Sequence, residues 1–173
     1  MKRILLVLAM VASISCLFCS CSVQLQMPTT QVHPSFYNYK YVYIIPTNTI
    51  SGGHISGNNY GTSGFTNSTN PANVIAGILM EKGYIILPQL QEEFLDKTLV
   101  VSFGELPKQL NGLTFSTCTI LLQFRDAKTS ELVASSKADG VSKNEWSFIH
   151  PTEADGVRNA IIRALDALFT PLN

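Results

Sequence analysis

The sequence predicts an α+β domain in which two helices pack on one face of a mostly antiparallel sheet. Three observations support this fold class. Several short runs are rich in aromatic and β-branched residues, two segments carry apolar residues at helical spacing, and a polar turn joins two consecutive apolar runs. In chain order the expected elements are β-α-β-β-β-β-α.

The first strand is expected in YKYVYIIP (39–46), where aromatic and β-branched residues alternate with others. The next segment, 47–69, is polar, with five glycines and no charged residue. Segments of this length inside a domain are usually functional or disordered, so we expect a flexible loop or a partner-binding loop. A nucleotide-binding loop would need a lysine directly after its last glycine, and no Lys or Arg occurs between Lys40 and Lys82.

The first helix has well-marked ends. Asn70 is a good N-cap, Pro71 suits the first helical position, and Gly83 is placed to end the helix. Its expected buried face consists of Val74, Ile75, Ile78 and Leu79. A short strand (84–87), a polar connector and a buried strand (99–103) follow.

The segments 115–124 and 132–138 are expected to pair as an antiparallel hairpin, because a short turn separates them. In that turn Asp126, Thr129 and Ser130 can each bond a nearby backbone amide. The apolar side of the first strand consists of Cys118, Ile120, Leu122 and Phe124.

The last helix is predicted by apolar residues at helical spacing, and Thr152 with Asp155 forms a plausible capping box at its start. One face of this helix is therefore expected in the core. The apolar positions are Val157, Ala160, Ile161, Ala164, Leu165 and Leu168, and the outward positions are Arg158, Asn159, Arg163 and Asp166.

Residues 1–20 have the layout of a secretory signal peptide, since Lys2 and Arg3 precede the unbroken apolar run 4–11. A membrane-spanning helix needs about 20 predominantly apolar residues. Serines and cysteines interrupt this stretch earlier, so we expect the segment to be removed.

The sequence Phe18-Cys19-Ser20-Cys21 resembles the lipobox of bacterial lipoproteins. In that family the cysteine thiol is diacylated and the signal peptide is cleaved directly before it. The resemblance implies a lipid on Cys21, with Cys16 leaving in the cleaved peptide together with Cys19. An ordinary cleaved signal, an anchor helix and a metal site are the alternatives. A zinc site would need a second pair of ligands, and the remaining candidates, His33, His54, His150 and Cys118, are scattered.

This division gives a tether over 21–37 and one domain over 38–173. Cleavage removes Lys2 and Arg3 from 12 basic residues, which leaves 10 against 12 acidic ones and a formal net charge of −2. No basic stripe is present, so we expect no nucleic-acid partner. No cofactor is expected either.

Several segments of the domain, EKGY, KTLVVSFGE and LLQFRDAKTSELVASSKADG, together with the order of its elements, resemble small Gram-negative envelope lipoproteins, mostly of unknown function. The resemblance covers residues 38–170 in pattern. It implies an envelope accessory protein, and it carries no catalytic residue across to this chain.

Individual candidates for chemistry have plainer structural interpretations. Cys118 is expected to be a buried, inert thiol, because a catalytic cysteine would need a basic partner such as His54 or His150. The adjacent pair Glu92 and Glu93 is expected in a solvated connector. Trp146 is expected to pack over the edge of the core, and His150 to lie at the surface. No catalytic motif appears, so we predict that the protein is not an enzyme.

The leading hypothesis is a non-catalytic lipoprotein that binds another envelope protein or a cell-wall component. The alternative is a small-ligand carrier in which segment 47–69 covers a cavity between helices and sheet. Ser22 follows Cys21 and no acidic run comes after it. By the sorting rules of bacterial lipoproteins, this predicts the periplasm-facing side of the outer membrane.

Overall fold

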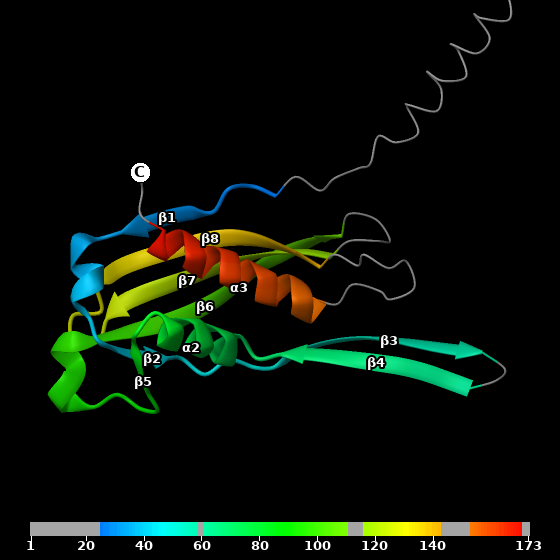
Figure 1. Cartoon of the computed structure of the whole chain (residues 1–173), viewed down its shortest axis with the longest axis horizontal. Helices are drawn as coiled ribbons and strands as arrows, with labels where there is room; N and C mark the ends of the chain where they lie inside the picture. The colour runs from blue at the N-terminus through cyan, green and yellow to red at the C-terminus, as the bar shows by residue number, and fades with distance from the viewer. Residues whose placement is uncertain (1–24, 59–60, 111–115, 143–152, 171–173) are drawn as a thin grey trace, which may run out of the picture.

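The computed structural model describes residues 25–58, 61–110, 116–142 and 153–170. Two helices, two 3-10 turns and eight strands form in these ranges (Figure 1). In chain order they are β1 (Thr29–Val32), η1 (Pro34–Asn38), β2 (Tyr41–Ile44), β3 (Ile50–Asn58), β4 (Gly61–Thr69), α2 (Pro71–Glu81), β5 (Ile85–Leu87), η2 (Glu92–Lys97), β6 (Thr98–Leu110), β7 (Ser116–Asp126), β8 (Leu132–Ser142) and α3 (Glu153–Phe169).

The main sheet has six strands in the order β1-β8-β7-β6-β2-β5. β1, β8, β7 and β6 pair antiparallel, whereas β2 is parallel to both of its neighbours, β6 and β5. The α+β class is therefore present, but the sheet is mixed. The prediction of a mostly antiparallel sheet and of the order β-α-β-β-β-β-α was wrong.

The parallel pairs follow from the helix between β2 and β5. α2 carries the chain back along the sheet, so that β5 enters in the same direction as β2, as in other strand-helix-strand connections. The register runs from Tyr41 opposite Ile85 to Tyr43 opposite Leu87. η2 likewise returns the chain between β5 and β6. β6 pairs with β2 on the side opposite to β5.

The core lies between the sheet and the two helices, which both cover the same face (Figure 1). Alternate side chains of a strand point to opposite faces. On β7 the predicted apolar side chains face the helices, with Ile120, Leu122 and Phe124 fully buried. The helix faces predicted to be buried are buried at Ile75 and Leu79 of α2 and at all six positions expected for α3.

The segment predicted as a loop, 47–69, instead forms mainly the two strands β3 and β4. They pair residue for residue from Ile50 opposite Thr69 to Asn58 opposite Gly61. In Figure 1 this hairpin extends beyond the end of the six-stranded sheet. Glycines and small polar residues are weak strand formers, so the pairing leaves little trace in the sequence.

The predicted tether is also partly wrong, because the domain begins before residue 38. β1 pairs with β8, from Thr29 opposite Lys137 to Val32 opposite Ala134. In η1 the side chain of Phe36 is fully buried in the core. Residues 29–37 are therefore part of the folded domain.

The predicted ends of α2 are confirmed. The Asn70 side chain accepts a hydrogen bond from the Asn73 amide at 3.3 Å, and Pro71 begins the helix. Gly83 takes a positive φ of 91° just after the helix, where a residue with a Cβ would be strained. The predicted capping residue Thr152 of the last helix lies outside the described residues.

In the β7–β8 turn, Asp126 and Thr129 bond backbone amides with their side chains as predicted, whereas Ser130 uses its backbone. Asp126 accepts hydrogen bonds from the amides of Lys128 and Thr129, both at 2.7 Å, as expected. The Thr129 hydroxyl accepts one from the Glu131 amide at 3.3 Å. Ser130 contributes through its backbone, with a positive φ of 63° and an amide that donates to the Asp126 carbonyl at 2.9 Å.

Beyond the end of β1, side chains of α3 occupy the edge of β8. Asn159 donates to the Val141 carbonyl at 2.9 Å, and Arg163 donates to the Asp139 carbonyl. Both residues were expected to point outward; Asn159 is exposed as expected, whereas Arg163 is half-buried. Both bond edge carbonyls that would otherwise be open to pairing with another strand.

Candidate functional site

The sequence candidates do not assemble into a reactive site within the described residues. Cys118 lies on the helix-facing side of β7 and is 3% exposed, so its predicted burial is confirmed, while its inertness stays a prediction. The side chains of Glu92 and Glu93 are exposed on η2, as expected of a solvated connector. Cys21, Trp146 and His150 lie outside the described residues, as do Cys16 and Cys19. His54 belongs to β3, opposite Phe65.

Ser35, which the sequence analysis did not consider, and His33, which it considered only as a metal ligand, lie together at the start of η1. The His33 Nδ1 atom is 2.8 Å from the Ser35 hydroxyl and accepts a weaker hydrogen bond from the Ser35 amide at 3.3 Å. This arrangement caps the 3-10 turn. A nucleophile-base pair would also need an orienting group and oxyanion donors around it, and no hydrogen bond joins this pair to an acidic side chain among the described residues.

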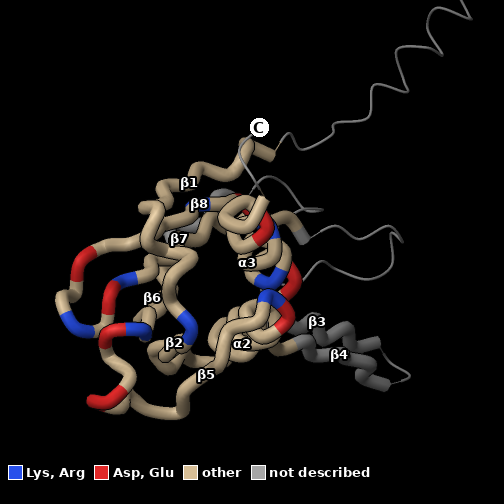
Figure 2. The backbone as a smooth tube through the Cα atoms, turned by 60° about the vertical axis from the view of Figure 1, so that its left-hand side comes forward, with Lys and Arg blue, Asp and Glu red and all other residues tan. Residues whose placement is uncertain are grey.

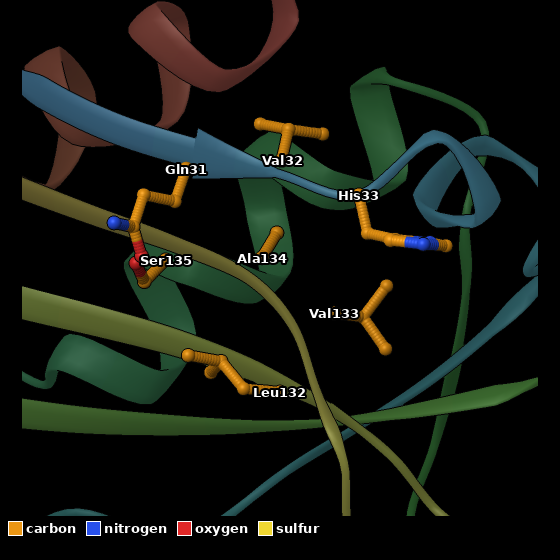
Figure 3. A pocket seen from close by; sticks show the side chains of 7 residues that line it. All are labelled: Gln31, Val32, His33, Leu132, Val133, Ala134 and Ser135. Carbon is orange, nitrogen blue, oxygen red and sulfur yellow. The ribbon is translucent and has the colours of Figure 1, made fainter.

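One surface hollow lies where β1 meets β8 (Figure 3). Its volume is about 250 Å³, and its lining residues are Gln31, Val32, His33, Leu132, Val133, Ala134 and Ser135. The register of β8 against β7 shifts at this point, so Val133 is an extra residue in the strand. Figure 3 shows the side chains of Gln31 and Ser135 close together on one side of the hollow. Apart from the imidazole of His33, the lining side chains are apolar or carry a neutral amide or hydroxyl group.

A second hollow, which we call the aromatic pocket, combines rings with positive charge. It has a volume of about 260 Å³. Its lining residues are Tyr37, Tyr39, Lys40, Lys82, Gly83, Tyr84 and Phe169. They come from three places: the end of η1 with the residues before β2, the link from α2 to β5, and the last residue of α3. No sequence pattern joins these segments, so only the fold brings them together.

The rings of the pocket rest on a buried support. Phe36 is fully buried, and its ring centroid is 6.3 Å from that of Tyr84 and 5.8 Å from that of Phe169. The centroids of Tyr84 and Phe169 are themselves 6.0 Å apart. Tyr37 is 60% exposed at the rim, and its hydroxyl donates to the Leu168 carbonyl at 3.3 Å.

Tyr39 joins the pocket to the β7–β8 turn. Its hydroxyl donates to the Asp126 carboxylate at 2.6 Å. Burial, together with this hydrogen bond and the negative charge of Asp126, raises the pKa of Tyr39 to about 12. Burial by itself would raise the pKa of Asp126, but hydrogen bonds from Tyr39 and from the amides of Thr129 and Lys128 outweigh it and lower that pKa.

The full charges of the pocket at neutral pH are therefore its lysines. Burial, with a smaller effect of Tyr37, raises the pKa of Tyr84 and keeps that phenol neutral. Lys82 Nζ lies 5.6 Å from the Phe169 ring centroid, and Lys40 Nζ lies 5.8 Å from that of Tyr41. Neither ammonium group forms an ion pair with a carboxylate in the described ranges, whereas Lys128 pairs with Asp96 on exposed side chains.

Charge elsewhere on the domain is sparse and mixed. Figure 2 shows acidic and basic positions interspersed along the turns and the helices, while the strands are mostly uncharged. No group of three or more His, Cys, Asp or Glu residues in the described part of the chain could hold a metal ion. None of the described helices is long and apolar enough to cross a membrane.

Comparison with known proteins gives structural neighbours of low similarity. No protein-family model matches the chain, and no curated protein matches it. Two solved structures of dodecameric PelC from Paraburkholderia phytofirmans, one of them a point variant, are 12% and 11% identical to this chain, with TM-scores of 0.49 and 0.47. Both alignments cover 84% of this chain, and they cover 98% and 99% of the PelC chains. At these values the likeness carries no function across.

Proposed function

We propose that this chain is a non-catalytic lipoprotein whose domain binds another envelope protein or a cell-wall component. A lipid on Cys21 would hold it at the periplasm-facing side of the outer membrane. The sequence around that cysteine supports the anchor.

The observation that carries the binding role is the contrast between a packed core and a surface with hollows. Where α2, α3 and the sheet meet, Ile75, Leu79 and Leu165 are fully buried among apolar neighbours. The described hollows lie at the surface, beside β1 and at the ends of the two helices. This arrangement favours contacts made on the outside of the domain over the alternative of a carrier with an interior cavity.

The test compares two variants of the mature protein, purified in detergent. One portion of each is sedimented with isolated cell walls, and another is immobilised and exposed to solubilised envelope proteins. Tyr37→Ala removes an exposed ring at the rim of the aromatic pocket, whereas Lys128→Gln changes an exposed side chain paired with Asp96. We expect retention of a wall component or a defined protein by the parent and by Lys128→Gln, with weaker retention by Tyr37→Ala.

Two results would contradict the proposal. One is the absence of any retained wall component or protein. The other is a stoichiometric small apolar molecule that remains bound to the protein in native mass spectrometry, because this would identify a carrier. Thermal unfolding of both variants, followed by circular dichroism, controls for loss of the fold.

A further inference from the structure

The aromatic pocket presents ring faces that are fixed before any ligand arrives. Tyr84 and Phe169 are half-buried, and both contact the fully buried ring of Phe36. A rigid ring loses little conformational freedom when a ligand stacks on it. The faces of aromatic rings carry partial negative charge and attract the polarised C–H groups of an apposed surface.

The charge of the pocket favours an anion. Lys40 and Lys82 both line it, and no acidic side chain does. Two helices also end here, at Glu81 and Phe169, and each helix end carries about half a negative charge at most.

The partial negative charge of these helix ends does not cancel the positive charge of the two lysines, because the carbonyl groups at the helix ends largely accept hydrogen bonds. The amides of Lys82 and Gly83 donate to carbonyls of the last turn of α2 at 3.1 and 2.9 Å. At the end of α3 the Thr170 amide and the Tyr37 hydroxyl donate to the carbonyls of Asp166 and Leu168. Among the groups that line the pocket, two full positive charges therefore outweigh two partial negative ones. The Asp126 carboxylate lies behind Tyr39, where it accepts hydrogen bonds from the Tyr39 hydroxyl and from two backbone amides.

The size of the pocket limits what it can hold. Its volume of about 260 Å³ is below the range of about 300–1,000 Å³ that is usual for pockets enclosing a drug-sized ligand. It therefore suits a single ring that belongs to a longer chain. The hydroxyls of Tyr37 and Tyr84 each add a group that can accept or donate a hydrogen bond.

A sugar ring bearing a carboxylate matches all three properties. Its C–H face can lie against the aromatic faces, its carboxylate can pair with an ammonium group, and its hydroxyls can bond the tyrosines. An acidic peptide offers carboxylates but no comparable flat C–H face. We propose that the aromatic pocket binds one acidic sugar unit of an anionic polysaccharide. This inference rests on the binding function proposed above and names its ligand class.

The test measures binding of trigalacturonate to the full mature chain in detergent by isothermal titration calorimetry. Neutral galactotriose and hexaglutamate are titrated in parallel. We expect trigalacturonate to bind and the other two to bind at least about tenfold more weakly, a factor that corresponds to one favourable charged contact of about 1.4 kcal/mol. Affinity for trigalacturonate should fall as salt concentration rises.

Three variants locate the site. The double variant Lys40→Gln/Lys82→Gln should weaken trigalacturonate binding about tenfold, since it removes both ammonium groups that line the pocket. Tyr37→Ala should weaken it as well, while Lys128→Gln should leave it unchanged. Circular dichroism of each variant checks that the fold persists.

The proposal is overturned if trigalacturonate does not bind, or if it binds equally to the double lysine variant. Equal or tighter binding of hexaglutamate would show an acidic-peptide site instead, and equal binding of galactotriose would show that charge plays no part. Retention of a protein partner in the experiment of the preceding section, with no trigalacturonate binding, would refute the sugar site and leave the binding function intact.

Discussion

Gly140 lies where β8 passes closest to α3, and its replacement by alanine should damage the packing of the whole layer. A Cβ added at this position would be 2.6 Å from the Ala160 amide nitrogen and 2.7 Å from the Ala160 Cβ. It would be closer still to the carbonyl oxygen of Gly156. Two of these three atoms belong to the backbone of α3, so no side-chain rotation can relieve the clash.

The loss of stability depends on how far α3 must move away from β8. To restore an ordinary contact distance of 3.4 Å to the Ala160 Cβ, α3 must withdraw by about 0.7 Å, and it must withdraw further to clear the Gly156 carbonyl oxygen. A gap of about 0.5–1 Å forfeits a quarter to a half of each dispersion contact. The neighbouring side chains Val157, Ile161 and Ala164 are all fully buried and would share this loss. We therefore expect Gly140→Ala to lower the free energy of unfolding by about 3 kcal/mol.

Gly104→Ala on β6 is the matched control. The nearest atom to its added Cβ would be the Leu121 carbonyl oxygen at 3.8 Å, an ordinary contact, and its φ lies outside the left-handed region. We expect this variant to be neutral or more stable by up to about 1 kcal/mol, because alanine has less freedom in the unfolded chain. Urea unfolding of both variants in detergent, followed by circular dichroism, gives the comparison. Equal midpoints for the two variants would refute the packing argument.

Three further predictions concern the anchor, the start of the domain and one hydrogen bond. Cys21→Ser should abolish incorporation of radiolabelled fatty acid and membrane anchoring; undiminished incorporation would exclude Cys21 as the lipid site. A chain that starts at residue 38 lacks β1 and Phe36 and should fold poorly, because losing a buried phenylalanine alone costs about 3–5 kcal/mol; cooperative unfolding at the parent's temperature would contradict this. Tyr39→Phe should cost about 1–2 kcal/mol at pH 8 through the lost bond to Asp126. The folded-state pKa of Tyr39 is raised to about 12, so the contribution of its hydroxyl to stability is complete below about pH 10 and is lost as the pH rises through about 12. The free energies of unfolding of parent and variant in urea should therefore converge at about pH 12. A difference that stays constant with pH would show that the phenol does not titrate as inferred.

The elements that the sequence predicted correctly have local causes. α2 is bounded by Asn70, Pro71 and Gly83, each of which acts within one turn of the helix, and the structure places all three as expected. The β7–β8 hairpin likewise depends on a short turn that begins at Asp126. Such short-range chemistry can be recognised from one sequence.

Apart from the β3–β4 hairpin, whose weak strand formers hid a local pairing, the errors concern pairings between distant segments. β1 is a run of four residues, TTQV, without a clear alternation, and it becomes a strand because β8 offers it a free edge. The parallel arrangement around β2 was missed because the hairpin of β3 and β4 separates that strand from α2. Strand order depends on tertiary contacts, which the local periodicity of a sequence does not report.

The aromatic pocket shows the same limit for a site. Tyr37, Lys82 and Phe169 are far apart in the sequence, and each alone looks like an ordinary surface or core-edge residue. Their meeting depends on both helices ending at the same edge of the core. Only the proposed lipobox, in which all the residues are consecutive, could be recognised as a candidate site from the sequence.

If Cys21 carries the proposed lipid, the pairing of β1 with β8 also sets how far from the membrane the domain can act. With Cys21 as the anchor, seven residues (22–28) separate the lipid from the first strand, and a fully extended chain of that length spans at most about 25 Å. A free tether over 21–37 would have spanned up to about 55 Å. The radius of the volume that the domain can sample thus falls by slightly more than half, and that volume falls about tenfold. A partner of the proposed lipid-anchored protein would therefore have to come close to the bilayer surface to be reached.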